Sequence, residues 1–174
     1  LLPRGVTPLL DAVGMGVAHF SKRLEGQQEK PDIVVVMVIT DGEENSSTEW
    51  TKAKVKQLIA EKEKAGWKFL YLGANLDAFA EAGTMGIQGT TTLAYTNNRI
   101  GTAALYACVS SGAVCARLAT SMGQDSAQAL SGFDWTAEQR LAAVGKGSCT
   151  CIGTPNGDPN CPIHKKEVLL KGAI

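Results

Sequence analysis

The stretch "IVVVMVITDGEENSS", residues 33–47, decides the fold class, because seven apolar residues run directly into a cluster of carboxylates, amides and hydroxyls. Residues 33–39 show no polar alternation, which predicts a strand buried on both faces, as in a parallel sheet. In open α/β sheets, ligands bind beyond the carboxyl ends of the strands. The polar cluster that begins at Asp41 is therefore either a ligand-binding position or an ordinary solvated turn.

Helical and strand patterns alternate along the chain on both sides of this stretch. The predicted elements, in chain order, are a helix over 7–24, a strand over 33–39, a helix over 48–66, a strand over 67–72, a helix over 75–83, a strand over 90–95 and a helix over 98–122. Strands separated by helices of this length favour an α/β fold with a parallel sheet and right-handed crossovers.

Polar residues at the helix starts supply candidate caps. Thr7 followed by Pro8 is typical of a helix N-terminus, and Ser47 or Thr48 is expected to cap the second long helix. Gly66 ends that helix. After residue 122 a short helix follows, in which Thr136 and Gln139 can form a capping box.

Composition excludes several function classes. Seventeen basic and seventeen acidic residues cancel, so no net charge attracts nucleic acid or an anionic membrane. The longest apolar run is far shorter than a membrane span. Five cysteines, an odd number, argue against a fully paired disulfide framework and suit a reducing, cytoplasmic compartment. The change in character after Gly123 predicts a domain over 1–122 and a C-terminal helix and tail over 123–174.

Two oxygen-bearing residues are expected to converge at one edge of the sheet. The helix that begins near Thr7 precedes the strand that ends at Asp41, so the helix N-terminus and the strand's carboxyl end lie on the same side. Magnesium takes carboxylate, hydroxyl and water oxygens as ligands. A cation site at Thr7 and Asp41 is one interpretation, and a plain Asp-Gly turn is the other.

The pattern G-x-T-P-L-x-D-A over 5–12, followed by a hydrophobic strand and T-D-G-E, resembles the von Willebrand factor type A domain. The stretch "FLYLGANLDAFAEAGTMGI", residues 69–87, is similar to bacterial and phage-encoded members of that family. The resemblance covers roughly 3–122 and implies a Rossmann-like α/β fold. It implies a metal-ion-dependent adhesion site for Mg²⁺ or Mn²⁺, with Thr7 as a direct ligand and Asp41 as an outer carboxylate.

The family's Asp-x-Ser-x-Ser loop and the strand before it are missing from this sequence, which begins at Leu1. We therefore expect an N-terminally truncated chain with an incomplete metal site. By the resemblance, the partner is a protein that presents a carboxylate, and Glu43, Glu44 and Asn45 form the surrounding rim. Ser46 and Ser47 are expected to cap the outgoing helix. The resemblance implies a bacterial or phage binding module with no enzymatic activity.

The tail offers a separate set of soft ligands. Cys149, Cys151, Cys161 and His164 fall within sixteen positions, and zinc sites use four thiolate or imidazole ligands. A disulfide, or a disordered tail with scattered cysteines, would explain the same residues.

Two further functions remain open. Mg²⁺-dependent phosphoryl-transfer or hydrolytic enzymes also place Asp after a buried strand, but haloacid-dehalogenase-type enzymes need a second Asp where this chain has Glu43, and no phosphate loop is present. A zinc-stapled structural component of a phage particle would use the sheet only as a scaffold.

Overall fold

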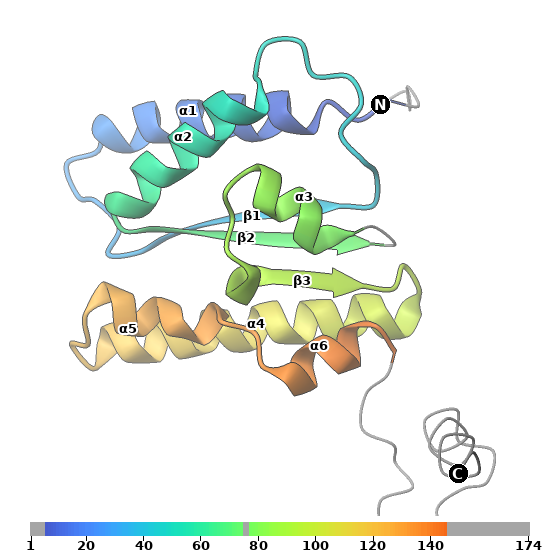
Figure 1. The fold of residues 1–174 in the computed structure, drawn as a ribbon. Helices are drawn as coiled ribbons and strands as arrows, with labels where there is room; N and C mark the ends of the chain where they lie inside the picture. Colours follow the sequence, from blue (N-terminus) through green and yellow to red (C-terminus); the bar gives the residue numbers. More distant parts are fainter. Residues whose placement is uncertain (1–5, 75–76, 146–174) are drawn as a thin grey trace, which may run out of the picture.

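The structure is a computed structural model that describes residues 6–74 and 77–145. The elements, in chain order, are α1 (Leu9–Glu25), β1 (Val34–Thr40), α2 (Lys52–Lys64), β2 (Trp67–Ala74), α3 (Ala78–Thr84), the 3-10 helix η1 (Gly89–Thr91), β3 (Thr92–Tyr95), α4 (Arg99–Ser121), α5 (Ser126–Leu130), the 3-10 helix η2 (Ser131–Phe133) and α6 (Ala137–Ala143) (Figure 1).

The described strands form one parallel sheet in the order β1-β2-β3. Val34 pairs with Trp67 at the start of β1, and Thr40 pairs with Gly73 at its end. β3 pairs with the second half of β2. The predicted parallel α/β arrangement is confirmed, with each strand displaced by at most a few residues from its predicted position.

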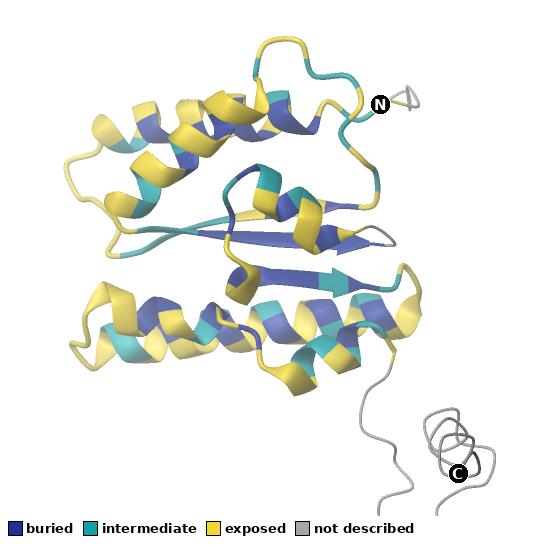
Figure 2. Ribbon diagram, in the orientation of Figure 1, coloured by how far each residue is buried: buried dark blue, intermediate teal, exposed yellow. Residues whose placement is uncertain are grey.

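Helices cover both faces of the sheet, with α1, α2 and α3 on one side and α4, α5 and α6 on the other (Figure 1). β2 alternates between the two cores. Phe69 and Tyr71 pack in the core under α1, α2 and α3, whereas Leu70 and Leu72 pack in the core against α4. All four side chains are fully buried, and Figure 2 shows β2 dark blue between exposed outer helix faces. β2 is therefore the centre of the molecule.

The described residues after Gly123 pack on the body of the fold. Phe133 and Trp135 belong to the same core as α4, and the backbone N–H of Trp135 donates to the Thr90 carbonyl oxygen at 3.0 Å. The predicted capping box of Thr136 and Gln139 is present at the start of α6. The division at residue 123 stays a prediction, because most of the proposed tail lies outside the described residues.

β1 is an edge strand, which corrects the expectation that residues 33–39 are buried on both faces. Met37 and Ile39 are 36% and 46% exposed. An unbroken apolar run does not by itself separate a central strand from an edge strand, because burial also depends on how many strands the sheet contains.

Two predicted helix starts are wrong in detail. α1 has Pro8 at its N-cap position, and the Thr7 side chain makes no capping hydrogen bond. α2 begins at Lys52, where the Thr51 side chain accepts from the Lys54 N–H, so neither Ser47 nor Thr48 caps it. Gly66 does follow the end of α2, with a positive φ of 86°. Ser47 and Thr48 form hydrogen bonds with Asp11 of α1 instead.

Gly101 allows α4 to approach the end of β3 and α6. A methyl group at this position would lie 2.8 Å from the Ala143 carbonyl oxygen and would overlap the Thr96 carbonyl oxygen. We predict that Gly101→Ala destabilises the fold by about 1–3 kcal/mol, because backbone atoms on both sides must move. Urea unfolding followed by circular dichroism measures this change.

Gly83→Ala is the matched control, because nothing lies within 4 Å of the added methyl group in α3. This variant should be neutral or more stable by up to about 1 kcal/mol, as expected for Gly→Ala in a helix. Equal effects of the two substitutions would show that the close approach at Gly101 does not limit the packing of α4.

Candidate functional site

Thr7 and the turn after β1 meet at the carboxyl edge of the sheet. The Thr7 N–H donates to Asn45 Oδ1 at 2.8 Å, and the Asn45 N–H donates to the Thr7 carbonyl oxygen at 3.3 Å. A methyl group at Gly42 would lie 2.8 Å from Thr7 Oγ1, so a side chain there would have to displace the Thr7 hydroxyl. The structure therefore places the Thr7 hydroxyl against the residue that follows Asp41.

Thr40 shapes the turn that carries Asp41. Its hydroxyl donates to the Gly42 carbonyl oxygen at 2.8 Å and accepts from the Gly42 N–H at 3.2 Å. Thr40 is buried, whereas Asp41 is exposed at the tip of the turn. Burial raises the pKa of the Tyr95 phenol at the end of β3, and the negative charge of Asp41 raises it further. Asp41 thus projects at the edge where the strands end.

Glu44 turns back from this edge and holds the first turn of α1. Its Oε2 accepts from the Leu10 N–H at 2.8 Å and from the Ser47 hydroxyl at 2.7 Å. Its Oε1 accepts from the N–H groups of Ser46 and Ser47 at 2.9 and 2.8 Å. One carboxylate therefore satisfies an N–H at the start of α1 and closes its own loop, and its negative charge complements the dipole of α1.

These contacts decide the acidity of Glu44. Burial acts to raise the pKa of its carboxyl group, but the hydrogen bonds from the Ser47 hydroxyl and from the Leu10, Ser47 and Ser46 N–H groups outweigh it and lower the pKa to about 2. Glu44 is therefore held as a carboxylate, and its oxygens are occupied inside the protein.

Asp11 makes the reciprocal connection from α1 to the same loop. Its carboxylate accepts from the backbone N–H groups of Thr48, Glu49 and Trp50 at 2.7–3.0 Å. The bond from Thr48 is the main cause that lowers the pKa of Asp11. The Asp11 N–H in turn donates to Ser47 Oγ at 3.1 Å. Two carboxylates from opposite sides thus join residues 44–50 to the start of α1.

Trp50 completes this junction through packing. It lies so close to Gly14 that a methyl group there would overlap the indole ring. Gly14 is buried within α1, and Trp50 packs against the core under α1, α2 and α3. The long connection from β1 to α2 is therefore fixed at both ends, by Thr7 and Gly42 on one side and by Gly14 and Trp50 on the other.

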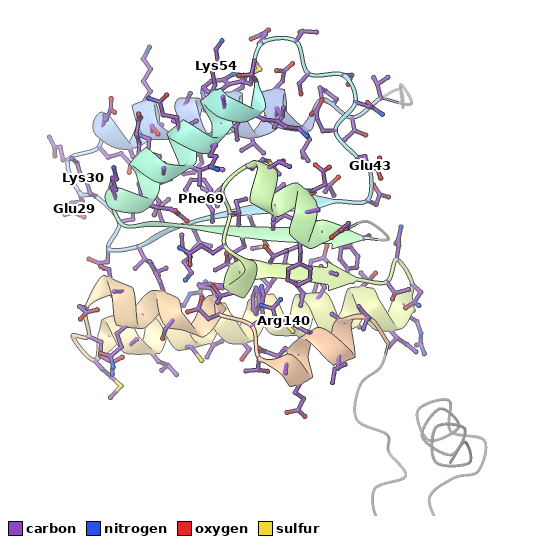
Figure 3. All side chains as sticks on the ribbon, viewed as in Figure 1. Glu29, Lys30, Glu43, Lys54, Phe69 and Arg140 are labelled. Atoms are coloured by element: carbon purple, nitrogen blue, oxygen red, sulfur yellow. The ribbon has the colours of Figure 1, made fainter. Side chains whose placement is uncertain are left out.

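The expected rim divides into two kinds of residue. Glu43 is exposed, and no hydrogen bond to its side chain is found within residues 6–74 and 77–145. Figure 3 shows it beside the carboxyl end of β1. Glu44 and Asn45, by contrast, bind Leu10 and Thr7. The expectation that Ser46 and Ser47 cap the outgoing helix is wrong, because Ser47 binds the N-terminal turn of α1.

Thr7 and Asp41 are the site residues that the structure brings to one edge. No group of three or more His, Cys, Asp or Glu side chains that could hold a metal ion occurs in the described part of the chain. The residues proposed for zinc, Cys149, Cys151, Cys161 and His164, lie outside the described residues.

Sequence reasoning missed the part that Asp11 plays. An acid in the first turn of a helix is a recognised signal for hydrogen bonding to backbone N–H groups. What the sequence could not indicate is which N–H groups it binds, since these lie 37–39 residues away. Gly14 was a second signal, because glycine inside a helix often marks a close packing contact.

Comparison with known proteins identifies no relative. The chain matches no protein-family model, and no curated protein or solved structure matches it. The site must therefore be interpreted from its own geometry.

Glu44→Gln tests the junction through its pH dependence. The folded-state pKa of Glu44 lies below the usual value of 4.5. The charged carboxylate therefore stabilises the fold above pH 4.5, and this stabilisation is lost as the pH falls toward 2. We predict that Glu44→Gln lowers the free energy of unfolding by about 1–2 kcal/mol at pH 7, after allowance for solvent screening. Between pH 5 and pH 2.5 the difference from the wild type should shrink.

Glu43→Gln is the matched control, because it makes the same change one residue earlier on an exposed side chain. The free energy of unfolding of this variant should equal that of the wild type at pH 7 and at pH 3. Urea titrations at pH 7 and pH 3 measure both variants, and a Glu44→Gln effect that is independent of pH would contradict the proposed ionic contact.

Proposed function

We propose that the protein is a divalent-cation-dependent protein-binding module, in which Thr7 and Asp41 form one corner of a Mg²⁺ or Mn²⁺ site. The observation that carries this proposal is the convergence of the Thr7 hydroxyl with the Asp41–Gly42 turn at the carboxyl edge of a parallel sheet. This edge is where α/β proteins bind ligands. The resemblance to the von Willebrand factor type A domain implies the same two residues, with Thr7 as a direct ligand and Asp41 as an outer carboxylate.

The polar groups around this corner differ in what they can offer a ligand. Glu44 and Asn45 are used inside the junction, whereas Asp41 and Glu43 are exposed. Thr7 uses its backbone N–H and carbonyl oxygen to hold Asn45, so that its side chain is positioned without being consumed by those two bonds. The junction thus holds the corner rigidly while leaving oxygen atoms for a cation.

A cation at this corner would keep open coordination positions. Mg²⁺ prefers six oxygen ligands and retains water where the protein supplies few. A carboxylate of a partner protein can replace such water, so the cation would bridge the two proteins. The partner is accordingly defined by its chemistry, as a protein with an accessible Asp, Glu or C-terminal carboxylate.

A binding role accounts for this edge better than hydrolysis or phosphoryl transfer. Those reactions need a second positioned acid or a phosphate-binding loop near Asp41. Glu43, the nearest acid in sequence, is exposed and lies beyond the turn. We therefore propose a module without enzymatic activity.

Paramagnetic Mn²⁺ tests the cation corner directly. We predict weak binding, in which the amide NMR signals of Thr7 and Gly42 broaden at the lowest Mn²⁺ concentrations and recover when excess Mg²⁺ competes. Asp41→Ala should abolish this selective broadening, and Thr7→Ala should weaken it, because each substitution removes one oxygen group from the corner.

Asp32→Ala is the matched control, since Asp32 is an exposed acid that precedes β1 at the opposite end of the strand. It should leave the broadening at Thr7 and Gly42 unchanged. Tight stoichiometric Mg²⁺ binding that Asp41→Ala does not affect, or broadening spread evenly over all acidic residues, would refute the proposed site.

A further inference from the structure

α4 exposes an uncharged, largely apolar face along its length. Figure 1 shows this helix on the outside of the molecule, below β3 in that view. Its buried residues lie toward the sheet, whereas the outward side carries a row of residues at helical spacing. This row, which we call the α4 face, consists of Ile100, Ala103, Ala107, Ser110, Ser111, Val114, Leu118 and Met122, all of which are exposed. An exposed apolar surface of this extent marks an interaction site.

The two halves of the α4 face differ in the size of their side chains. The first half contains Ala103 and Ala107, whereas the second contains Val114, Leu118 and Met122, which are 53%, 57% and 74% exposed. Two such faces in parallel would place alanine against alanine and leave a gap. In the antiparallel orientation each alanine meets a large residue, as in well-packed cores. The α4 face is therefore complementary to itself when one copy is reversed.

We propose that the α4 face binds the α4 face of a second copy of this chain, in an antiparallel dimer with two-fold symmetry. The symmetry axis passes between Ser110 and Ser111. Ala107 then meets Val114 of the second copy, and Ala103 meets Leu118. Each contact occurs twice, as in any interface between identical surfaces. The spacing of three and four residues along the row is the one that keeps two paired helices in contact.

A hollow beside the small half of the face favours this register. It has a volume of about 300 Å³ and lies between Ala104 and Ala107 of α4 and residues 138–142 of α6. In the proposed dimer, Leu118 of the second copy lies over this hollow, because it stands opposite Ala103. The large half of one face thus fills the space that the small half of the other leaves open.

The charges beside the face are compatible with self-pairing. α4 contains two arginines and no acidic residue. Arg117 is exposed, and its side chain makes no ion pair within residues 6–74 and 77–145. In the proposed register it lies near Tyr106 of the second copy, whose ring is 57% exposed on the same flank of the helix. A guanidinium group over a tyrosine ring is a favourable contact.

The size of the face predicts a weak dimer. A helix of 23 residues is about 35 Å long, and a strip one helix wide is about 10 Å across. Each copy therefore contributes about 350 Å², and the pair about 700 Å², before the flanking residues are counted. Stable interfaces bury at least about 1,000 Å². We expect a reversible dimer that dissociates on dilution.

A membrane is the main competing occupant, because α4 also has the length and composition of a membrane-spanning helix. However, Leu105 and Cys108 on its inner side are buried in the core with β2 and β3. The helix cannot leave the sheet without exposing them. A further strand beyond β1 would not cover the α4 face either, since this face is directed away from the sheet.

A compensating pair of substitutions, Ala103→Leu and Leu118→Ala, tests the register. Light scattering of the whole chain over a dilution series, with reducing agent and without divalent cations, measures the dissociation constant independently of the proposed cation site. Ala103→Leu should weaken the dimer by about tenfold or more, because two large side chains then collide. Leu118→Ala should weaken it similarly, because the hollow stays unfilled. The double variant should return to within about threefold of the wild type, since it only exchanges the large and small positions.

Ala60→Leu is the matched control, because it makes the same change at an exposed alanine of α2, on the other side of the sheet, and it should dimerise like the wild type. Urea unfolding at low concentration should show that Ala103→Leu and Leu118→Ala leave the monomer folded. A wild-type chain that stays monomeric up to about 1 mM would overturn the proposal. A tighter dimer in Ala103→Leu, as a parallel pair would give, would overturn the antiparallel register. Binding of a monomeric chain to phosphatidylcholine vesicles that Leu118→Ala abolishes would assign the face to a membrane instead.

Discussion

The fold depends on two carboxylates that link the start of α1 to the loop after β1, one supplied by each segment. Glu44 accepts hydrogen bonds from Leu10 and from its own loop, while Asp11 accepts three from residues 48–50. The first N–H groups of a helix have no partner within the helix, and neither do those of an irregular loop. Each carboxylate satisfies donors that the other segment cannot satisfy alone. A connection of eleven residues between β1 and α2 is thereby held in one conformation.

The hydrogen bonds of this junction also divide the acidic residues 41–44 into two kinds, those bound inside the protein and those exposed. Glu44 is committed to the junction, and its lowered pKa reflects several donated hydrogen bonds. Asp41 and Glu43 remain exposed beside it. An acidic cluster therefore does not act as a unit. Its inner member stabilises the protein, and its outer members are the ones that can meet a cation or a partner. Thr7 is held beside them by its two hydrogen bonds with Asn45.

Local patterns in the sequence predicted most of the architecture. The apolar runs indicated the three parallel strands, and Thr136 and Gln139 form the predicted capping box. The failures share a physical cause, which is dependence on distant segments. Ser47 and Thr48 are good local caps, yet α2 begins later because these residues bind α1, more than thirty positions away. The exposure of Ile39 likewise depends on the number of strands, which no local pattern contains.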